Sequence, residues 1–448
     1  MRDLSKLVKA YDVRGVVGEE IDADIVREVG AAFARLVGTS VAVVHDMRPS
    51  SEPFAEAFAE GVISQGQDVV HVGLGSTDLV YFAAGRLDIA GAMITASHNP
   101  ARYNGIKLCR PGATPVGQDS GLAEIRAMLE DGIPVHTGAP GTVAHRDLTS
   151  DYAEYLRKLV DLNGIRPLKV AVDAANGMAG HMVPIVFRGL PVEIVPMYFE
   201  LDGTFPNHEA NPLVSANLVD LQNKVREVGA DIGLAFDGDA DRCFVVDETG
   251  APVPPSAIVA LIATRELAKT PGSAIVYNAI TSRAVPEIIT EHGGVPVRAR
   301  VGHTFVKALM AERDAVFGGE HSGHYYFRDF WRADTGMLAA LHILAALGTT
   351  DKPLSTLVSE YTRYAASGEI SFQVHDVPST LAAIEAKYDG AEIDRLEGLT
   401  VRLDGNAWFN LRPSNTEPLL RLNVEAPDRD TMAGIRDEVI ASIGASNS

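Results

Sequence analysis

Residues 232–246 read IGLAFDGDADRCFVV, so an acidic loop lies between two short apolar runs. Four further apolar runs, rich in valine, isoleucine and alanine, occur at residues 41–44, 89–94, 170–172 and 274–277. Each ends in a polar or glycine-rich turn, and most alternate with stretches of helical period. This alternation is typical of βα units with a buried, mainly parallel sheet. The sequence therefore predicts an α/β protein.

Helical periodicity predicts helices at residues 23–37, 52–64, 150–160, 215–228, 256–268 and 335–347. Asp334 and Thr335 are candidate caps for the last of these helices, because short oxygen-bearing side chains accept hydrogen bonds from a first helical turn. After residue 369 the helical pattern ends, and the strand-like residues 370–374 follow. We therefore expect an α+β unit at the C-terminal end.

The chain has 448 residues, which at about 150 residues per domain suggests two to four domains. Its composition changes near residues 142–147, 250–255 and 365–369. We place domain boundaries there, which gives three α/β domains and one α+β domain. The expected domains are residues 1–147, 148–251, 252–365 and 366–448.

The composition excludes several classes of protein. Hydrophobic residues make up 46% of the chain and charged residues 22%, which excludes a disordered or collagen-like protein. The 39 lysines and arginines against 59 aspartates and glutamates give a formal charge of -20. This charge repels polyanions, so we expect no nucleic acid and no anionic membrane as partner. A small phosphorylated substrate is compatible with this negative charge, because a few local cations suffice to bind one phosphate.

The cysteines and the N-terminal residues bear on the compartment. Cys109 and Cys243 are far apart and match no metal-ligand spacing, which favours a reducing compartment over a disulfide framework. Residues 1–6 are polar and lead into no apolar segment, and no stretch approaches the roughly 18 apolar residues of a membrane span. The sequence therefore predicts a cytoplasmic protein.

The first loop whose residues could take part in a reaction is residues 95–100, TASHNP, directly after the run at 89–94. It places Ser97 at the mouth of a sheet, where the hydroxyl is a candidate nucleophile or phosphate carrier. A polar turn with a capping serine is the alternative. In the following NGIK, Lys107 could carry a proton if burial lowers its pKa, or it could be a solvated charge.

The second loop holds Asp237, Asp239 and Asp241 within one turn. Three neighbouring carboxylates repel one another unless a cation lies between them. Hard oxygen ligands suit Mg²⁺ or Ca²⁺. A divalent-cation site is therefore the preferred interpretation, and a plain acidic hairpin turn is the alternative.

Two further loops have the composition of a sugar site and of a phosphate site. In residues 318–326, GGEHSGHYY, a glutamate, a serine and a histidine alternate and can face one polyol. In residues 412–418, RPSNTEP, an arginine precedes hydroxyl and amide donors suited to a dianionic phosphate. Each alone could be an ordinary turn. One such loop falls in each expected domain, which suggests a single site for phosphoryl transfer on a polyol phosphate.

With YDVRG at residues 11–15, these motifs follow one another along the chain in a characteristic order. In these motifs and their order the chain resembles the α-D-phosphohexomutases, the phosphomannomutase and phosphoglucomutase superfamily. The resemblance runs essentially end to end. It implies four domains around a central cleft, three with a mixed α/β core and a fourth, C-terminal α+β domain resembling the TATA-binding-protein fold.

The resemblance also implies a role for each motif. Ser97 would be the phosphoserine of the resting enzyme, and one of its phosphate oxygens would join the metal ligands. Asp237, Asp239 and Asp241 would bind Mg²⁺, with Arg14 and Arg242 as helper cations. Lys107 and His303 would be candidate general acid and base, and His324 would lie near the reacting end. Tyr11 and Arg242 would contact the substrate, Glu320 and Ser322 would bind the sugar 3- and 4-hydroxyls, and the phosphate that is not transferred would be bound by Arg412, Ser414, Asn415 and Thr416.

The implied reaction is a two-step exchange. Phosphoserine phosphorylates a hexose 1-phosphate, the hexose 1,6-bisphosphate turns end for end, and the serine recovers the other phosphoryl group, so that a trace of bisphosphate serves as primer. Residues 319–324 and Ala240 look like the phosphomannomutase type, so mannose phosphates are the expected substrates, with glucose phosphates also accepted. Phosphoglucomutase and phosphoglucosamine mutase stay open as main activities, and we expect a monomer or a homodimer.

Two other classes of function compete. A phosphatase could use Asp237 as nucleophile and Asp239 as acid, but it would leave the serine, sugar and phosphate loops without a role. A non-catalytic sugar-phosphate-binding protein would bind without isomerisation. The chain departs from the resemblance at residues 279–283, which lack a lysine found in some relatives, and at Ala210, which replaces an expected proline.

Overall fold

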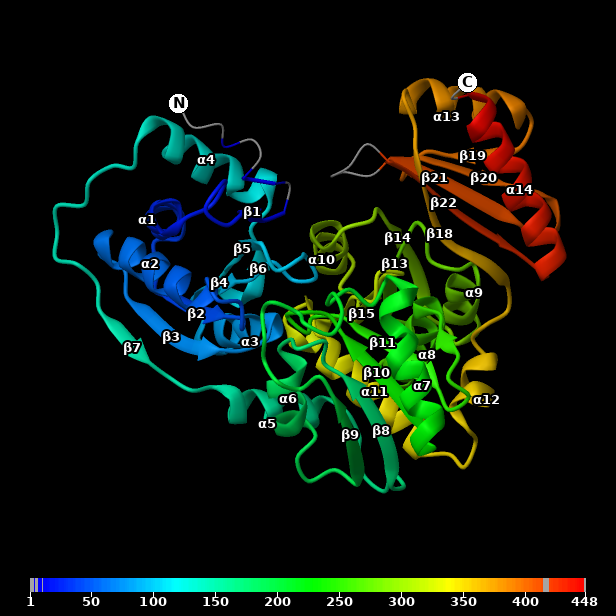
Figure 1. Ribbon diagram of the computed structural model, residues 1–448, viewed down its shortest axis with the longest axis horizontal. Coiled ribbons are helices and arrows are strands. Elements are labelled where there is room, and N and C mark those ends of the chain that lie inside the picture. The colour runs from blue at the N-terminus through cyan, green and yellow to red at the C-terminus, as the bar shows by residue number, and fades with distance from the viewer. Residues whose placement is uncertain (1–3, 5–6, 10, 414–418, 447–448) are drawn as a thin grey trace. The chain divides into compact units, whose positions relative to one another are not determined.

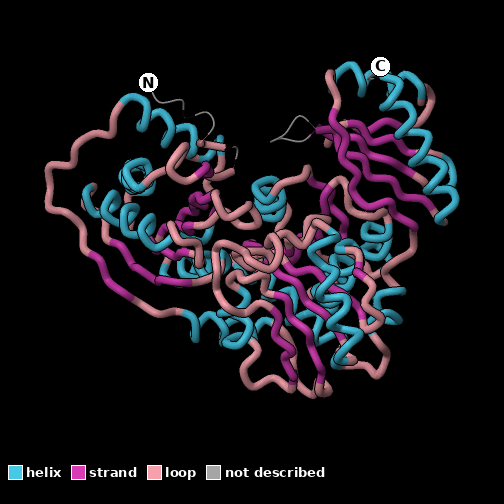
Figure 2. Tube along the Cα trace, viewed as in Figure 1, coloured by secondary structure: helices cyan, strands magenta, loops and turns pink. Residues whose placement is uncertain are grey.

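The computed structural model describes residues 4, 7–9, 11–413 and 419–446. The chain divides into two compact units, and Figures 1 and 2 show their elements. The first unit comprises Met1–Pro255 and Ser322–Leu357, and the second comprises Ser256–His321 and Val358–Ser448. The first unit therefore contains the serine loop and the acidic loop, and the second contains Glu320 and Arg412.

The first unit contains a seven-stranded sheet in the order β1-β5-β4-β2-β3-β7, with β6 paired to β5. Its strands are β1 (Val13–Val16), β2 (Val41–His45), β3 (Val69–Leu74), β4 (Ala90–Ile94), β5 (Tyr103–Arg110), β6 (Thr114–Pro115) and β7 (Val143–His145). Strands β4, β2, β3 and β7 run parallel, whereas β5 is antiparallel to both β4 and β1. The accompanying helices are α1 (Ala23–Val37), α2 (Ser51–Ser64), α3 (Thr77–Leu87) and α4 (Leu122–Asp131), with the 3₁₀ turns η1 (Pro111–Ala113) and η2 (Gln118–Ser120).

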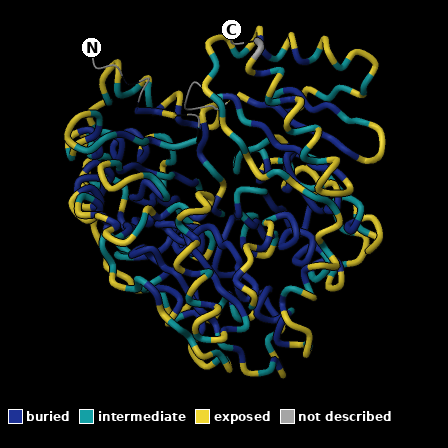
Figure 3. Tube along the Cα trace, turned by 45° about the vertical axis from the view of Figure 1, so that its right-hand side comes forward, coloured by how far each residue is buried: buried dark blue, intermediate teal, exposed yellow. Residues whose placement is uncertain are grey.

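Burial explains why the central strands read as continuous apolar runs. Every residue of β2 and of β4 is buried, because helices such as α2 and α3 pack against these parallel strands. Figure 3 shows the buried segments of the chain in dark blue. Helices α1 and α2 pack into the same core, in which Phe33 and Phe58 are fully buried. The start of α1 is set by Asp22, whose carboxylate accepts a hydrogen bond from the Ile25 amide.

A second sheet of the first unit has the order β12-β11-β10-β8-β9. Its strands are β8 (Leu168–Asp173), β9 (Val192–Met197), β10 (Ile232–Phe236), β11 (Cys243–Asp247) and β12 (Pro252–Val253). Strands β8, β9 and β10 are parallel, and β10 and β11 form an antiparallel pair whose connection is the acidic loop. The other elements of this unit are α5 (Thr149–Leu159), α6 (Ala179–Val186), η3 (Ser215–Leu218), α7 (Val219–Val228), β16 (Tyr325–Phe327), η4 (Arg328–Phe330), β17 (Ala333–Asp334) and α11 (Gly336–Gly348).

The second unit contains three parallel strands and an antiparallel C-terminal sheet. The first group comprises β13 (Ala274–Asn278), β14 (Val295–Ala299) and β15 (Phe317–Gly319), with α8 (Pro255–Lys269), α9 (Ala284–Glu291), α10 (His303–Glu312) and α12 (Leu354–Ser359). The C-terminal sheet, in the order β18-β22-β21-β20-β19, comprises β18 (Ala365–Gln373), β19 (Glu392–Asp394), β20 (Leu399–Arg402), β21 (Trp408–Pro413) and β22 (Leu419–Ala426), with η5 (Asp404–Asn406), α13 (Val377–Lys387) and α14 (Arg429–Ser446). Ile384 of α13 and Val439 of α14 pack into one core with these strands.

Most elements predicted from periodicity are present, with four differences. The sheets of the first unit are mixed rather than mainly parallel, since β1, β5, β11 and β12 run antiparallel to their neighbours. The predicted helix at 215–228 begins as the 3₁₀ turn η3 before α7. Thr335 caps α11 by accepting a hydrogen bond from the Leu338 amide, whereas Asp334 belongs to β17. Several helices were not predicted, among them α3, whose residues 77–84 are all buried, and also α4, α6, α9 and α10.

Candidate functional site

Ser97 lies in the loop between β4 and β5, and its side chain is buried. Its backbone is in the left-handed region, with φ of 51°, which is a strained conformation for a residue with a side chain. The Ser97 amide donates to Thr95 Oγ1 over 2.9 Å. Ser97 Oγ donates to Asp237 Oδ2 over 2.8 Å. The strained loop thus aims the hydroxyl at the acidic loop.

The serine loop and the acidic loop approach each other closely at Gly238. A Cβ atom at this position would lie 2.4 Å from the carbonyl oxygen of Ser97, so only glycine permits the contact. Ala240 in the same loop also adopts a left-handed conformation, with φ of 59°. The spacing of the three aspartates by small residues therefore lets the loop fold tightly against Ser97.

The three aspartates are fully buried and form a candidate cation site. One carboxylate oxygen from each of Asp237, Asp239 and Asp241 lies within 4.8 Å of the others. Burial, together with the charges of Asp241 and Asp239, raises the pKa of Asp237 to about 7. Among the described residues, Asp239 Oδ1 is a buried oxygen that accepts no hydrogen bond. This oxygen-only donor set, with an unsatisfied carboxylate oxygen, fits Mg²⁺.

Lys107 projects from β5 into the acidic cluster. Its Nζ lies 2.7 Å from Asp239 Oδ2 and 2.6 Å from Asp241 Oδ2. Burial alone would lower the pKa of Lys107, but the two carboxylates outweigh it and raise the pKa. The lowered pKa on which a proton-carrying role would depend is therefore absent, and the two carboxylates hold Lys107 as a cation.

Two arginines lie beside the serine loop. Arg14 Nη1, from β1, donates to Asn99 Oδ1 over 2.6 Å. Arg242 Nε lies 3.1 Å from Asp237 Oδ2, and its Nη2 donates to Ser97 Oγ over 3.3 Å. Burial and the Arg242 charge hold the pKa of His98 well below its ordinary value, so its neutral ring accepts a hydrogen bond from Arg242. Both arginines can therefore stabilise negative charge that develops near Ser97.

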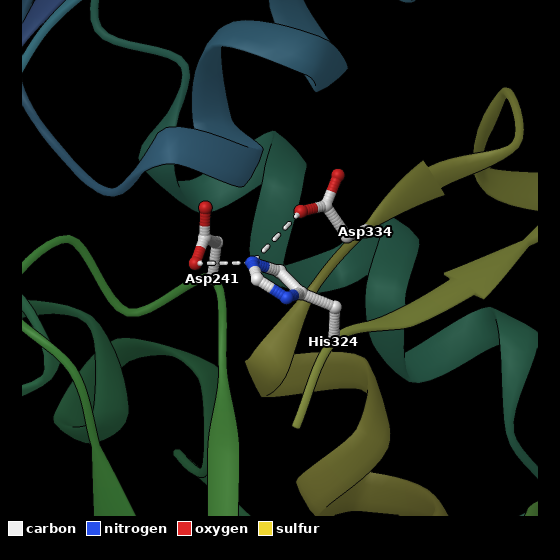
Figure 4. A group of neighbouring side chains, drawn as sticks. All are labelled: Asp241, His324 and Asp334. Carbon is white, nitrogen blue, oxygen red and sulfur yellow. Dashed lines mark ion pairs between the residues drawn. The ribbon is translucent and has the colours of Figure 1, made fainter. Parts of the chain in front are cut away.

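His324 faces two carboxylates in the first unit, as Figure 4 shows. Its Nε2 lies 3.5 Å from Asp241 Oδ1 and 3.8 Å from Asp334 Oδ2, and its Nδ1 lies 3.0 Å from Ser322 Oγ. Burial would lower the pKa of His324, but Asp241 and Asp334 raise it. The arrangement holds the imidazole in one orientation at the edge of the acidic cluster.

Three of the predicted site residues in the second unit, Glu320, His303 and Arg412, are among the described residues. Glu320 is buried at the end of β15 and accepts hydrogen bonds from Asn278 Nδ2 over 3.2 Å and from the Gly302 amide over 3.0 Å. The second bond holds the glutamate next to the turn at which His303 begins α10. Arg412, on β21, pairs with Glu369 over 2.5 Å. Ser414, Asn415 and Thr416 lie outside the described residues.

Comparisons with known proteins cover nearly the whole chain. Models of the phosphoglucomutase/phosphomannomutase alpha/beta/alpha domains I, II and III match residues 5–133, 150–250 and 254–364, and the model of the C-terminal domain matches residues 369–442. The chain belongs to the phosphoglucomutase/phosphomannomutase family. The four matches in order confirm the predicted four-domain α/β architecture of a phosphohexomutase, and the protein is an isomerase.

Individual relatives agree with this assignment. The chain is 40% identical over 445 residues to phosphohexose mutases of Xanthomonas campestris, covering 97% of this chain and 98% of the relative. It is 39% identical over 448 residues to a phosphomannomutase of Escherichia coli, with the same coverage. A crystal structure of a phosphoglucomutase/phosphomannomutase family protein from Burkholderia thailandensis matches with a TM-score of 0.88 and 32% identity, covering 98% of this chain and 97% of that one.

The phosphohexomutase structure groups the predicted residues by unit. In the first unit, Ser97, Lys107, Arg242 and His324 surround the acidic loop, and Tyr11 lies just before β1, the strand of Arg14. In the second unit, Glu320 and His303 lie on adjoining turns, and Arg412 is on the C-terminal sheet. In the described part of the chain, no helix combines the length and the apolar character that a membrane span requires.

Sequence reasoning missed three residues of the first unit. Thr77, the first residue of α3, donates from Oγ1 to Asp239 Oδ2 over 2.5 Å. Asp334 was considered only as a helix cap, yet it faces His324. Arg48 lies buried against the serine loop. Polar residues directly after strands β2 and β3 were the available signal, because such loops meet at one edge of a parallel sheet.

Proposed function

We propose that this phosphohexomutase is a phosphomannomutase, which interconverts mannose 1-phosphate and mannose 6-phosphate and also accepts glucose phosphates. The observation that carries the proposal is the Ser97 hydroxyl held 2.8 Å from Asp237 beside two further buried aspartates. It combines a nucleophile with a site for charge neutralisation, which are the main needs of phosphoryl transfer. The phosphomannomutase relative at 39% identity supports the choice of sugar.

In the proposed reaction, Ser97 carries the phosphoryl group between the two ends of the sugar. The sugar 6-hydroxyl attacks phosphorus, the bond from phosphorus to Ser97 Oγ breaks, and a hexose 1,6-bisphosphate forms. After the bisphosphate has turned end for end, Ser97 Oγ attacks the phosphorus at position 1 and the sugar 1-oxygen leaves. The bisphosphate is thus both intermediate and primer, and the serine ends as it began.

The side chains of the first unit have distinct roles in this scheme. Asp237, Asp239 and Asp241 would hold Mg²⁺, which when bound neutralises charge on the transferred phosphoryl group. Arg14 and Arg242, which lie beside the serine loop, would stabilise the same charge. The proposed general acid and base are Lys107 and His303, and His324 would lie near the reacting end.

Recognition of the sugar phosphate is assigned to the remaining residues. Glu320 and Ser322 would bind the sugar 3- and 4-hydroxyls. Tyr11 would contact the substrate beside Arg14. Arg412 would grip the phosphate that is not transferred, with Ser414, Asn415 and Thr416 as further donors. Since this phosphate site would bind either phosphate of the bisphosphate, the same site would serve both half-reactions.

The remaining expectations form part of the same proposal. The domains would be residues 1–147, 148–251, 252–365 and 366–448. The partners would be small sugar phosphates, since the formal charge of -20 disfavours nucleic acids. The enzyme would act in the cytoplasm as a monomer or a homodimer.

A ³¹P NMR time course of mannose 1-phosphate with enzyme, Mg²⁺ and a trace of glucose 1,6-bisphosphate tests the proposal. We expect loss of the anomeric phosphate signal and growth of a 6-phosphate signal. Growth of free phosphate would favour an aspartate-nucleophile phosphatase instead, and an unchanged spectrum would favour a binding protein. A parallel run with glucose 1-phosphate measures the sugar preference.

A further inference from the structure

Arg48 has a fully buried side chain directly behind the serine loop. Its Nη2 donates to the carbonyl oxygens of Ser97 over 2.9 Å and of Asn99 over 2.7 Å. Its Nη1 donates to the carbonyl oxygens of Pro100 over 3.0 Å and of Tyr103 over 2.9 Å. One guanidinium therefore binds four backbone carbonyls of the segment that carries Ser97.

The guanidinium is itself held from two sides. Its Nε lies 3.3 Å from Asp46 Oδ2, and that buried carboxylate is fixed in turn by the Ser51 hydroxyl. On another side, the Phe205 ring centroid lies 5.0 Å from Arg48 Cζ, in a cation–π contact. The chain approaches so closely there that a Cβ on Gly203 would lie 2.5 Å from Arg48 Cα. Arg48 thus has one orientation.

The bond to the Ser97 carbonyl bears on the strained backbone of that residue. A left-handed conformation of a residue other than glycine persists only where its surroundings over-determine it. Thr95 Oγ1 holds the amide on one side of Ser97, and Arg48 holds the carbonyl on the other. Together they keep φ at 51° and so direct the hydroxyl to Asp237.

We propose that Arg48 is a positioning residue for phosphoryl transfer, because it fixes the backbone that aims Ser97 Oγ at the acidic loop. This inference rests on the proposed function, in which Ser97 carries the phosphoryl group. Arg48 acts through main-chain carbonyls of the loop. A lysine cannot replace it, because one ammonium lacks the planar fork of donors that reaches four acceptors.

The test measures the rate at which Ser97 is phosphorylated. Dephosphorylated enzyme is mixed with glucose 1,6-bisphosphate and Mg²⁺, quenched at intervals, and analysed by intact mass spectrometry. For Arg48→Ala we expect a rate constant about 100-fold lower, the order of effect of misplacing a reacting group by about 1 Å. The KM for mannose 1-phosphate should change by less than about twofold, since ground-state binding is untouched. The amplitude reports the folded fraction, which separates positioning from misfolding.

Chemical rescue gives a second readout. A cavity of about 900 Å³ is lined by Arg48, Asp46 and Glu52 among others, so the space left by the side chain in Arg48→Ala would lie beside it. Added methylguanidinium should restore at least about tenfold of the lost rate in Arg48→Ala, at the scale that one or two charge-assisted hydrogen bonds supply. Arg48→Lys should stay slow. The matched control is Arg27→Ala, which removes a half-exposed arginine of α1 and should leave the rate unchanged.

Each outcome decides the proposal. Wild-type rates of labelling in Arg48→Ala, with normal labelling of the wild-type enzyme, would overturn the role of Arg48 alone. Absence of label on wild-type Ser97 would overturn the proposed function and this inference with it. If Arg48→Ala does not fold by circular dichroism, Phe205→Leu decides, because it keeps the arginine and removes the ring that holds it. A severalfold slower labelling at unchanged KM supports the proposal, and an unchanged rate contradicts it.

Discussion

The hydroxyl of Ser97 donates a hydrogen bond to Asp237 across 140 residues of chain. Strand β4 carries the serine loop and strand β10 carries the acidic loop, so the contact joins two different sheets of the first unit. The serine loop and the acidic loop therefore lie together as one candidate site, although each could be an ordinary turn in isolation. This relationship gives the first prediction.

Ser97→Ala should abolish steady turnover and leave folding intact, because the residue lies in a loop and its side chain fills little volume. We expect a loss of about 1,000-fold or more in kcat, which corresponds to about 4 kcal/mol of transition-state stabilisation. The ³¹P NMR assay measures it. Ser120→Ala, which removes a hydroxyl in the 3₁₀ turn η2 of the same unit, is the control. Turnover near the wild-type level would contradict a carrier role for Ser97.

Asp239→Asn should weaken the dependence on Mg²⁺. Asp239 is fully buried between Lys107 and Thr77, so an amide in its place loses a charge at the cation site without a large change in shape. We expect the Mg²⁺ concentration for half-maximal activity to rise about tenfold or more, equal to about 1.4 kcal/mol. The control is Asp131→Asn at the exposed end of α4. An unchanged metal titration would refute the cation site.

Arg412→Ala should mainly raise the KM for mannose 1-phosphate, because a phosphate grip is lost. A charge-assisted pair of this kind contributes about 2 kcal/mol, so an increase of about 30-fold is expected. Glu369→Gln should act in the opposite direction. Glu369 pairs with both Arg412 and Arg421, so it competes with a phosphate for these cations. A pure rate effect of Arg412→Ala at unaltered KM would count against the assignment.

Asp78 should make the folded protein less stable as pH rises from about 4 to about 6. Burial, together with the nearby charge of Asp241, raises its pKa from 3.8 to about 6, although Ser76, Thr335 and Tyr152 donate hydroxyl hydrogen bonds to it. Since the folded pKa exceeds the unfolded one, the stabilisation is complete below pH 4 and is lost as pH rises through 6.

The size of this loss follows from the shift. About two pH units correspond to roughly 3 kcal/mol of unfolding free energy. Asp78→Asn removes the ionisation and keeps an acceptor for the hydroxyls. Urea unfolding at pH 4 and at pH 7 should therefore show a smaller decrease for Asp78→Asn than for the wild type. Equal decreases in both proteins would show that Asp78 is not the titrating group.

Local patterns were sufficient for much of the fold. The apolar runs at β2, β4, β8, β10 and β13 are visible in the sequence because a strand covered on both faces must be apolar along its length. The six helices predicted from their period are present, the almost wholly buried α11 among them, whereas α3 and others such as α4 and α9 were missed. The antiparallel edges of the mixed sheets were missed because periodicity along a strand carries no information on the direction of its neighbour.

The candidate site divides in the same way. Motif order alone indicated Ser97, the three aspartates, Glu320 and Arg412, since each motif is a short stretch whose residue types match one kind of chemistry. The proton-carrying role of Lys107 depended on its pKa, and that pKa is raised because two carboxylates of another sheet lie within 2.7 Å.

The sequence by itself determined the family, the order of the domains and the residue types available for phosphoryl transfer. Only the tertiary structure decided that Arg48 holds the backbone of Ser97 and that Asp334 faces His324. The physical reason is the separation along the sequence between the residues that interact. A turn, a cap or a helical face is set by residues a few positions apart, whereas a buried charge takes its partners from whichever segments the packed sheets bring to it.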